Sequence, residues 1–205
     1  MPDERLIVIA RHGESTLNEV QRVNGDPSVP VALTERGLAE ARLLGLQLAN
    51  TPLDVCFHSA FGRTRQTAET ALDGRAVPLR EEPLLNDIDV GRLEGEPLEA
   101  YRAWKRAHGR SAPFPEGESL DDAARRYARG YERILAEPYG HVLVVCHEIP
   151  LRYALNGAMA SDELDGPVHQ LGNAQPFLFT EQALRRAIET IRRLAPDDAE
   201  AHGDA

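Results

Sequence analysis

The sequence predicts an α/β protein, a three-layer α/β/α sandwich built around a mainly parallel central sheet. Short apolar, β-branched runs such as Leu6–Ala10 and Val142–Cys146 are typical of strands buried on both faces. Between these runs lie stretches whose apolar residues recur at helical spacing. Because strand and helix patterns alternate, we expect parallel strands with helices covering both faces of the sheet.

The first half of the chain contains three predicted strands. After the opening strand, residues 21–31 hold Asn-Gly-Asp-Pro and a further proline, which is the composition of a surface loop. A helix over residues 34–50 begins at a threonine cap and shows an apolar stripe. Val55–His58 is the second strand, a helix opens at Phe61, and Val77–Arg80 is the third strand.

The second half begins with an amphipathic helix over residues 97–108. Ser119 with Asp122 forms a capping box, so a helix is expected from there to Ala136. The remaining expected elements are strand 142–146, helix 150–160, strand 176–179 and helix 181–194.

The size and charge of the chain limit its class. At 205 residues and 42% hydrophobic residues, it predicts one domain over residues 1–196, followed by a polar, frayed tail at 197–205. The net charge of −10 argues against nucleic-acid binding and against anionic membrane surfaces. The two cysteines, Cys56 and Cys146, lie inside apolar strands and predict buried, reduced thiols. With no signal peptide or membrane-spanning segment visible, we expect a cytoplasmic protein.

Polar side chains follow two of the apolar strands. The first strand runs directly into Arg11-His12-Gly13-Glu14, and the strand at 142–146 ends at His147. Arg63 lies at a helix start, where free N–H groups already favour anions. Each feature alone is also typical of an ordinary surface turn. If the strands are neighbours, however, the groups converge on one anion-binding pocket at the carboxyl edge of the sheet.

At this point the chain resembles the histidine phosphatase superfamily, the phosphoglycerate-mutase-like family, and within it the phosphatase branch. The resembling motifs occur in the family's order between about Leu6 and Phe179. They are Arg11-His12-Gly13-Glu14, Ser59…Arg63…Thr67-Ala68-Glu69, Asp87…Gly91…Glu94-Gly95, Gly117-Glu118-Ser119 and Val145-Cys146-His147. The resemblance also implies an antiparallel edge strand.

The resemblance implies a role for each matching residue. His12 would be the nucleophile, and Arg11, Arg63 and a protonated His147 would surround the phosphate. The proton donor would be Asp87, where the family usually has Glu. Asp89 is the competing candidate, and Asp87 is preferred on its register within the motif.

Other candidate contacts are less specific. The family commonly has Gly-Gly after the second histidine, whereas this chain has Glu148-Ile149. We expect the side chain of Glu148 to point away from the phosphate, or else to bind a cationic or hydroxylated part of the substrate. Asn18 would reach the phosphate or cap the backbone locally. Gly25, in the loop near the mouth, and His58, at a strand end, are the remaining candidates.

These inferences together predict a phosphomonoester hydrolase that forms a phosphohistidine and acts on a small phosphorylated metabolite. Residues 91–118 would form a lid that selects the substrate. No cofactor and no metal are expected, because arginines supply the positive charge. The alternatives are a phosphoglycerate mutase, a catalytically weak phosphate-binding module, and a metal hydrolase built from His12, His147 and Asp87. Whether the protein is a monomer or a homodimer stays open.

Overall fold

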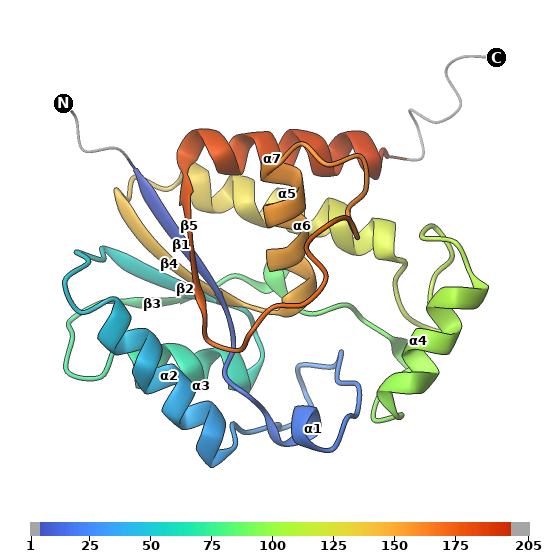
Figure 1. Ribbon diagram of the computed structural model, residues 1–205, viewed down its shortest axis with the longest axis horizontal. Helices are drawn as coiled ribbons and strands as arrows, with labels where there is room; N and C mark the ends of the chain where they lie inside the picture. The colour runs from blue at the N-terminus through green and yellow to red at the C-terminus, as the bar shows by residue number, and fades with distance from the viewer. Residues whose placement is uncertain (1–4, 198–205) are drawn as a thin grey trace.

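One five-stranded sheet organises the molecule. The computed structural model describes residues 5–197, so the predicted tail beyond Asp197 lies outside the described residues. The strand order is β3-β2-β4-β1-β5, with β5 alone antiparallel to its neighbour (Figure 1). The strands are β1 (Leu6–Arg11), β2 (Val55–His58), β3 (Leu79–Glu81), β4 (His141–Cys146) and β5 (Pro176–Thr180).

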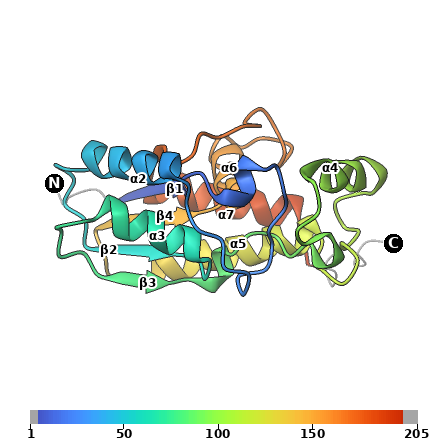
Figure 2. The same cartoon turned by 90° about the horizontal axis from the view of Figure 1, so that it is seen from below.

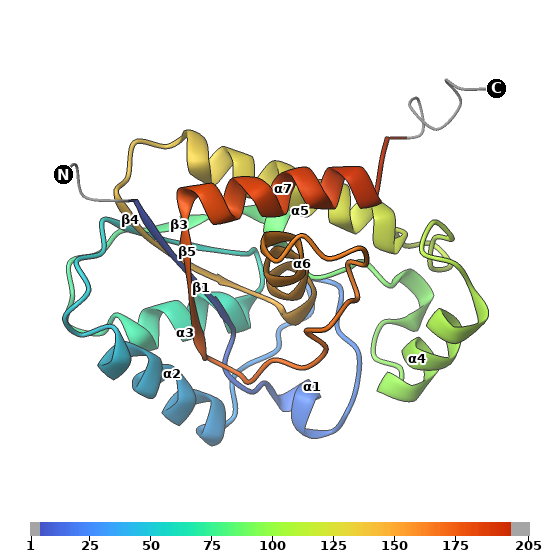
Figure 3. The same cartoon turned by 45° about the horizontal axis from the view of Figure 1, so that its top comes forward.

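Helices cover both faces of this sheet, as the alternating pattern predicts. α2 and α3 lie on one face, and α5, α6 and α7 lie on the other (Figure 1). α7 packs against both α5 and α6 (Figure 3). The predicted α/β sandwich is confirmed. The helices are α1 (Thr16–Glu19), α2 (Glu35–Gln47), α3 (Gly62–Ala71), α4 (Leu98–Ala107), α5 (Leu120–Ala136), α6 (Glu148–Ala158) and α7 (Glu181–Leu194), with 3-10 turns η1 (Pro83–Leu85) and η2 (Gly91–Leu93).

The central strands are apolar throughout because both of their faces are buried. In β1, Ile7 and Ile9 pack with the α5–α7 layer, whereas Val8 and Ala10 pack with the α2–α3 layer. β4 alternates in the same way, so each central strand contributes to two hydrophobic cores. This double burial fixes the register of β1 against β4, and with it the positions of the residues that follow each strand.

α4 is set apart from the sheet (Figure 2). It is held by stacked aromatic rings, with Trp104 lying 4.2 Å and Tyr101 5.4 Å from the buried ring of Phe114, measured between centroids. The backbone of Leu98 donates to the carbonyl of Gln21 at 2.8 Å. The helix is therefore fastened at its start and along one face rather than buried in a core.

α6 begins two residues earlier than the sequence analysis predicts. The predicted start at Pro150 is wrong, because the helix begins at Glu148 with His147 as its N-cap. Pro150 is tolerated in the first turn, where a backbone N–H has no intrahelical acceptor in any case. The second histidine therefore lies at a helix N-terminus.

Candidate active site

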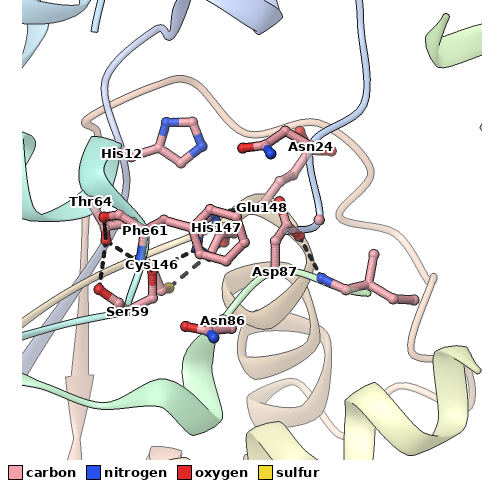
Figure 4. Close-up of polar contacts among 12 residues, drawn as sticks. His12, Asn24, Ser59, Phe61, Thr64, Asn86, Asp87, Cys146, His147 and Glu148 are labelled. Carbon is pink, nitrogen blue, oxygen red and sulfur yellow. Dashed lines mark hydrogen bonds and ion pairs between the residues drawn. The ribbon is translucent and has the colours of Figure 1, made fainter. Parts of the chain in front are cut away.

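The two strand-end histidines lie side by side. β1 and β4 are parallel neighbours, with Arg11 opposite Cys146, and the backbone of His12 donates to the carbonyl of Cys146 at 2.9 Å. This register puts His12 next to His147, with ring centroids 5.3 Å apart (Figure 4). The strand order thus brings together the two motifs that the sequence places 135 residues apart.

His12 is held in one tautomer. Its Nδ1 lies 2.7 Å from the carbonyl oxygen of Gly13, and since a carbonyl only accepts, Nδ1 bears the proton. The lone pair is therefore on Nε2, which accepts a hydrogen bond from Nε of Arg63 at 3.0 Å. Burial, and then the charges of Arg63 and Arg11, lower the pKa of His12 well below its ordinary value. The imidazole is neutral, and its lone pair is on Nε2.

Arg63 is the centre of the site. It enters from the first turn of α3 and is only 3% exposed. Its NH2 group lies 3.2 Å from Oδ2 of Asp87 and 3.1 Å from Nδ1 of His147, and its NH1 group donates to the side-chain oxygen of Asn24. Burial lowers the pKa of Arg63 to about 10, so the guanidinium is charged at neutral pH. One cation therefore touches both histidines and the candidate acid.

His147 is fully buried and hydrogen-bonded at both nitrogens. A guanidinium only donates, so Nδ1 accepts from Arg63, and Nε2 bears the proton and donates to Oγ of Ser59 at 2.8 Å. Burial, then Arg63 and His12, lower the pKa of His147 well below its ordinary value. His147 is thus neutral in this structure. The protonated form that the resemblance implies requires the negative charge of a phosphate nearby.

The two aspartates occupy different places. Oδ2 of Asp87 lies 3.4 Å from Nδ1 of His147, and burial raises the pKa of Asp87 against the opposing charge of Arg63. Asp89 is exposed, and its Oδ1 accepts from the backbone of Gly91 at 2.9 Å. The structure therefore brings Asp87 to the histidines (Figure 4) and leaves Asp89 outside.

Glu148 departs from the expectation. The prediction that its side chain points away is wrong, because Oε2 lies 2.8 Å from NH1 of Arg11. The first turn of α6 starts beside the end of β1, and the two opposite charges meet there. The other carboxylate oxygen lies 3.7 Å from Arg152, one helical turn further on.

The remaining sequence candidates have mixed outcomes. Asn18 caps α1, accepting from the backbone of Ser15 at 3.1 Å, and it also lines the cavity described below. Gly25 does not line that cavity. Its N–H donates to Glu94 at 2.6 Å, and an added Cβ would lie 2.2 Å from the carbonyl oxygen of Ile88. His58 is buried outside the cavity, with Nδ1 2.7 Å from the carbonyl of Ser59. The structure thus places Gly25 and His58 outside this cavity, and substrate contact by either residue stays a prediction.

Sequence reasoning missed Asn24. Its side-chain oxygen accepts from Arg63, and its Nδ2 donates at 2.7 Å to Glu94, which also binds the backbone of residues 25 and 26. In the sequence, Asn24 is typical of a turn residue. The neighbouring residues do not indicate that Glu94, 70 residues away, orients its side chain.

A cavity of about 600 Å³ opens over these groups. α4 lines one part of the cavity with Leu98, Tyr101 and three cations. Arg11, Glu148 and Arg152 line another part. Among the side chains that line it, cations outnumber carboxylates even though the whole chain is acidic. The cations are Arg11, Arg22, Arg63, Arg102, Lys105, Arg106 and Arg152, and the carboxylates are Glu14, Asp87 and Glu148. This composition suits a small anion.

Within residues 5–197, no three His, Cys, Asp or Glu side chains are placed to hold a metal ion.

Over the same residues, no helix has the length and apolarity that a membrane crossing requires.

Comparison with known proteins decides the family. The family model described as "Histidine phosphatase superfamily (branch 1)" matches residues 7–183. The chain belongs to this superfamily. Among curated relatives, a probable phosphoglycerate mutase, GpmB of Yersinia pestis, is 30% identical over 171 residues, which are 80% of this chain and 76% of that protein.

Solved structures of the histidine phosphatase fold agree. YhfR of Bacillus stearothermophilus superposes with a TM-score of 0.74 at 25% identity, covering 84% of this chain and 89% of that one. The alpha-ribazole phosphatase of Shigella flexneri gives a TM-score of 0.74 at 23% identity with the same coverage, which shows the fold alone. The family model and the curated relative support an enzyme of the phosphatase or mutase kind.

Proposed function

We propose that this histidine phosphatase family member hydrolyses a phosphomonoester of a small metabolite through a phosphohistidine on His12. The supporting observation is the hydrogen bond from Nδ1 of His12 to the carbonyl of Gly13, at 2.7 Å. It fixes the lone pair on Nε2, beside two arginines, and the lowered pKa keeps that nitrogen unprotonated. A neutral, oriented imidazole is the form that attacks phosphorus.

In the first step, Nε2 of His12 forms a bond to phosphorus while the bond from phosphorus to the ester oxygen breaks. Asp87 gives its proton to the departing alkoxide, so the alcohol leaves neutral. The raised pKa of Asp87 favours the protonated form that this step needs. In the second step, Asp87 takes a proton from water, the water oxygen bonds to phosphorus, and the phosphorus–nitrogen bond breaks.

Positive charge for the phosphate would come from Arg11 and Arg63. The family resemblance and the position of both guanidiniums beside His12 support this role. Preorganised cations in a buried site stabilise developing negative charge strongly, because they need no reorganisation during the reaction. The proposed reaction therefore proceeds without a metal ion.

The test is phosphate release from p-nitrophenyl phosphate and from a panel of phosphorylated metabolites, with a chelator present. We expect turnover by the wild type and a loss of at least about a thousandfold in His12→Ala, because the nucleophile is gone. His141→Ala, at the far end of β4, is the matched control and should keep full activity. Full activity of His12→Ala would disprove the mechanism, and loss of wild-type activity in chelator would favour a metal hydrolase. No phosphate release by a folded wild type would favour the mutase first and a binding module second.

A second candidate is phosphoglycerate mutase activity, because the curated relative described above has that name. The two reactions differ in what receives the phosphoryl group, water in one case and a hydroxyl of phosphoglycerate in the other. Incubation with a phosphoglycerate separates them, since hydrolysis gives inorganic phosphate and a mutase gives an isomeric phosphoglycerate.

A further inference from the structure

Glu148 places a carboxylate on an arginine that the proposed function assigns to the substrate phosphate. NH1 of Arg11 has two N–H groups. NH1 donates to the carbonyl of Leu171 at 3.0 Å, and it lies 2.8 Å from Oε2 of Glu148. Both of these contacts of the Arg11 guanidinium are with groups of the protein.

An acidic side chain accompanies each arginine next to the histidines. Glu148 lies 2.8 Å from Arg11, and Asp87 lies 3.2 Å from Arg63. A phosphate ester is itself an anion, so it competes with Glu148 for Arg11 and is repelled by it at close range.

A second arginine, Arg152, lies close to Glu148. Arg152, one helical turn along α6, lies 3.7 Å from Oε1 of Glu148 and is fixed by Asp165 at 2.6 Å. The side chain of Glu148 is 31% exposed and lies between the two cations, so a small rotation would bring it onto Arg152. A carboxylate between two arginines is a displaceable ligand of either.

We propose that Glu148 competes with phosphate for Arg11, which lowers the affinity of the site for every phosphate compound, and that it yields to phosphate by moving onto Arg152. The inference rests on the proposed function, in which Arg11 binds the substrate phosphate. Every phosphate compound meets the same competition, but only some can offset it.

The class of substrate follows from this competition. Inorganic phosphate touches only the pocket at His12, so nothing offsets the displacement of Glu148. An ester whose alcohol part extends along the cavity also contacts α4, where Tyr101 and Arg102 line the wall. Glu148 therefore raises the Kd of every phosphate compound, and esters of extended alcohols are the class whose added contacts still give tight binding. It also weakens inhibition by the product phosphate.

The experiment is calorimetric titration of the full chain with inorganic phosphate. Glu148→Gln removes the charge but keeps the shape, and we expect its Kd for phosphate to be at least about tenfold lower than that of the wild type. The matched control is Glu132→Gln, which also removes one carboxylate paired with an arginine, Arg192, but on the surface of α5. The control should bind phosphate as the wild type does.

Glu148→Ala is the second variant, and it should also bind phosphate more tightly if charge is the cause. An unchanged Kd in Glu148→Gln would mean that Glu148 only complements the helix dipole, as acids at helix N-termini do, and would overturn the proposal. Weaker binding in both variants would show that Glu148 positions Arg11, and that outcome also overturns it.

The variant Arg11→Gln distinguishes a failure of this inference from a failure of the proposed function. If Arg11→Gln binds inorganic phosphate as tightly as the wild type, Arg11 is not a phosphate ligand and the proposed function is wrong on that point. If Arg11→Gln weakens binding while Glu148→Gln does not strengthen it, only the role of Glu148 is wrong.

Discussion

At the scale of single residues, the site depends on where protons lie. Gly13 holds one on Nδ1 of His12, while Arg63 and Ser59 together place one on Nε2 of His147. The two histidines could be predicted from the sequence, because each follows an apolar run that is typical of a strand. The sequence could not supply the tautomers, since these depend on partners chosen by the fold.

The choice between Asp87 and Asp89 is tested by the leaving group. We expect Asp87→Asn to lower kcat/KM for an alkyl phosphate by about a hundredfold or more, because an alkoxide must be protonated as it departs. The loss should be much smaller for p-nitrophenyl phosphate, whose phenolate leaves without a proton. Steady-state kinetics with both substrates measure this difference.

Asp89→Asn provides the control, since Asp89 is exposed and bound to the backbone of Gly91. It should retain wild-type kcat/KM on both substrates. Equal losses for the two substrates in Asp87→Asn would contradict a role for Asp87 as the proton donor.

The contacts of two residues, Glu148 and Asn24, could not be predicted from the residue type. Glu148 was expected to avoid a phosphate site, but the neighbouring strand supplies Arg11 as a partner at 2.8 Å. Asn24 resembled a turn residue, yet Glu94 turns it toward Arg63. In both cases the deciding partner is distant in the chain, and local patterns have no access to it.

At the scale of elements, the loop after β1 is fixed by a close backbone contact with α2. An added Cβ on Gly37 would lie 2.0 Å from the carbonyl oxygen of Glu14, and one on Gly13 would lie 2.4 Å from the carbonyl oxygen of Gly37. Only glycine at both positions permits this approach. α2, which was assigned no chemistry in the sequence, thus helps to set the position of the His12 loop.

Gly37→Ala should therefore affect both stability and activity. We expect the free energy of unfolding to fall by about 1–3 kcal/mol, because the backbone must shift to admit the methyl group. The shift displaces the segment next to His12, so kcat/KM should fall as well. Urea denaturation and steady-state kinetics on the same preparation test both effects.

Gly109→Ala is the matched control, because no atom lies within 4 Å of its added Cβ. Its free energy of unfolding should stay within about 0.5 kcal/mol of the wild type. If Gly37→Ala matched this control in stability and activity, the contact between α2 and the loop would have no role in holding His12.

Element boundaries could be predicted where capping is local. The capping box of Ser119 and Asp122 set the start of α5 as expected. The start of α6 was placed two residues late, because Pro150 suggested a first residue when it only marks a tolerated position. Strand order needed the structure, since the pairing of β1 with β4 joins segments more than a hundred residues apart.

At the scale of the whole molecule, burying two neutral histidines makes stability depend on pH. An unfolded histidine has a pKa near ~6.5, whereas the folded pKa values of His12 and His147 lie well below that. Below the unfolded pKa, the unfolded chain binds more protons than the folded one. The histidines' contribution to stability is thus complete above about pH 6.5 and decreases as the pH falls toward the folded pKa values.

We expect the free energy of unfolding to fall between pH 7.5 and pH 5.5, with each buried histidine contributing up to about 1.4 kcal/mol per pH unit below its unfolded pKa. Asp87 has a raised folded pKa and opposes this trend, but it is one group against two. His147→Gln should show a shallower pH dependence than the wild type in urea denaturation. Equal slopes would contradict the neutral, buried state of His147.

The single tryptophan of the chain, Trp104, stands on α4, between the rings of Phe114 and His108. Indole emission from this protein therefore reports on one helix only, the wall of the cavity farthest from the sheet. Trp104 packs against these rings and does not line the cavity, so a change in its emission wavelength on adding a ligand reports a movement of α4, without labelling. The same signal distinguishes compounds that reach α4 from those confined to the neighbourhood of His12.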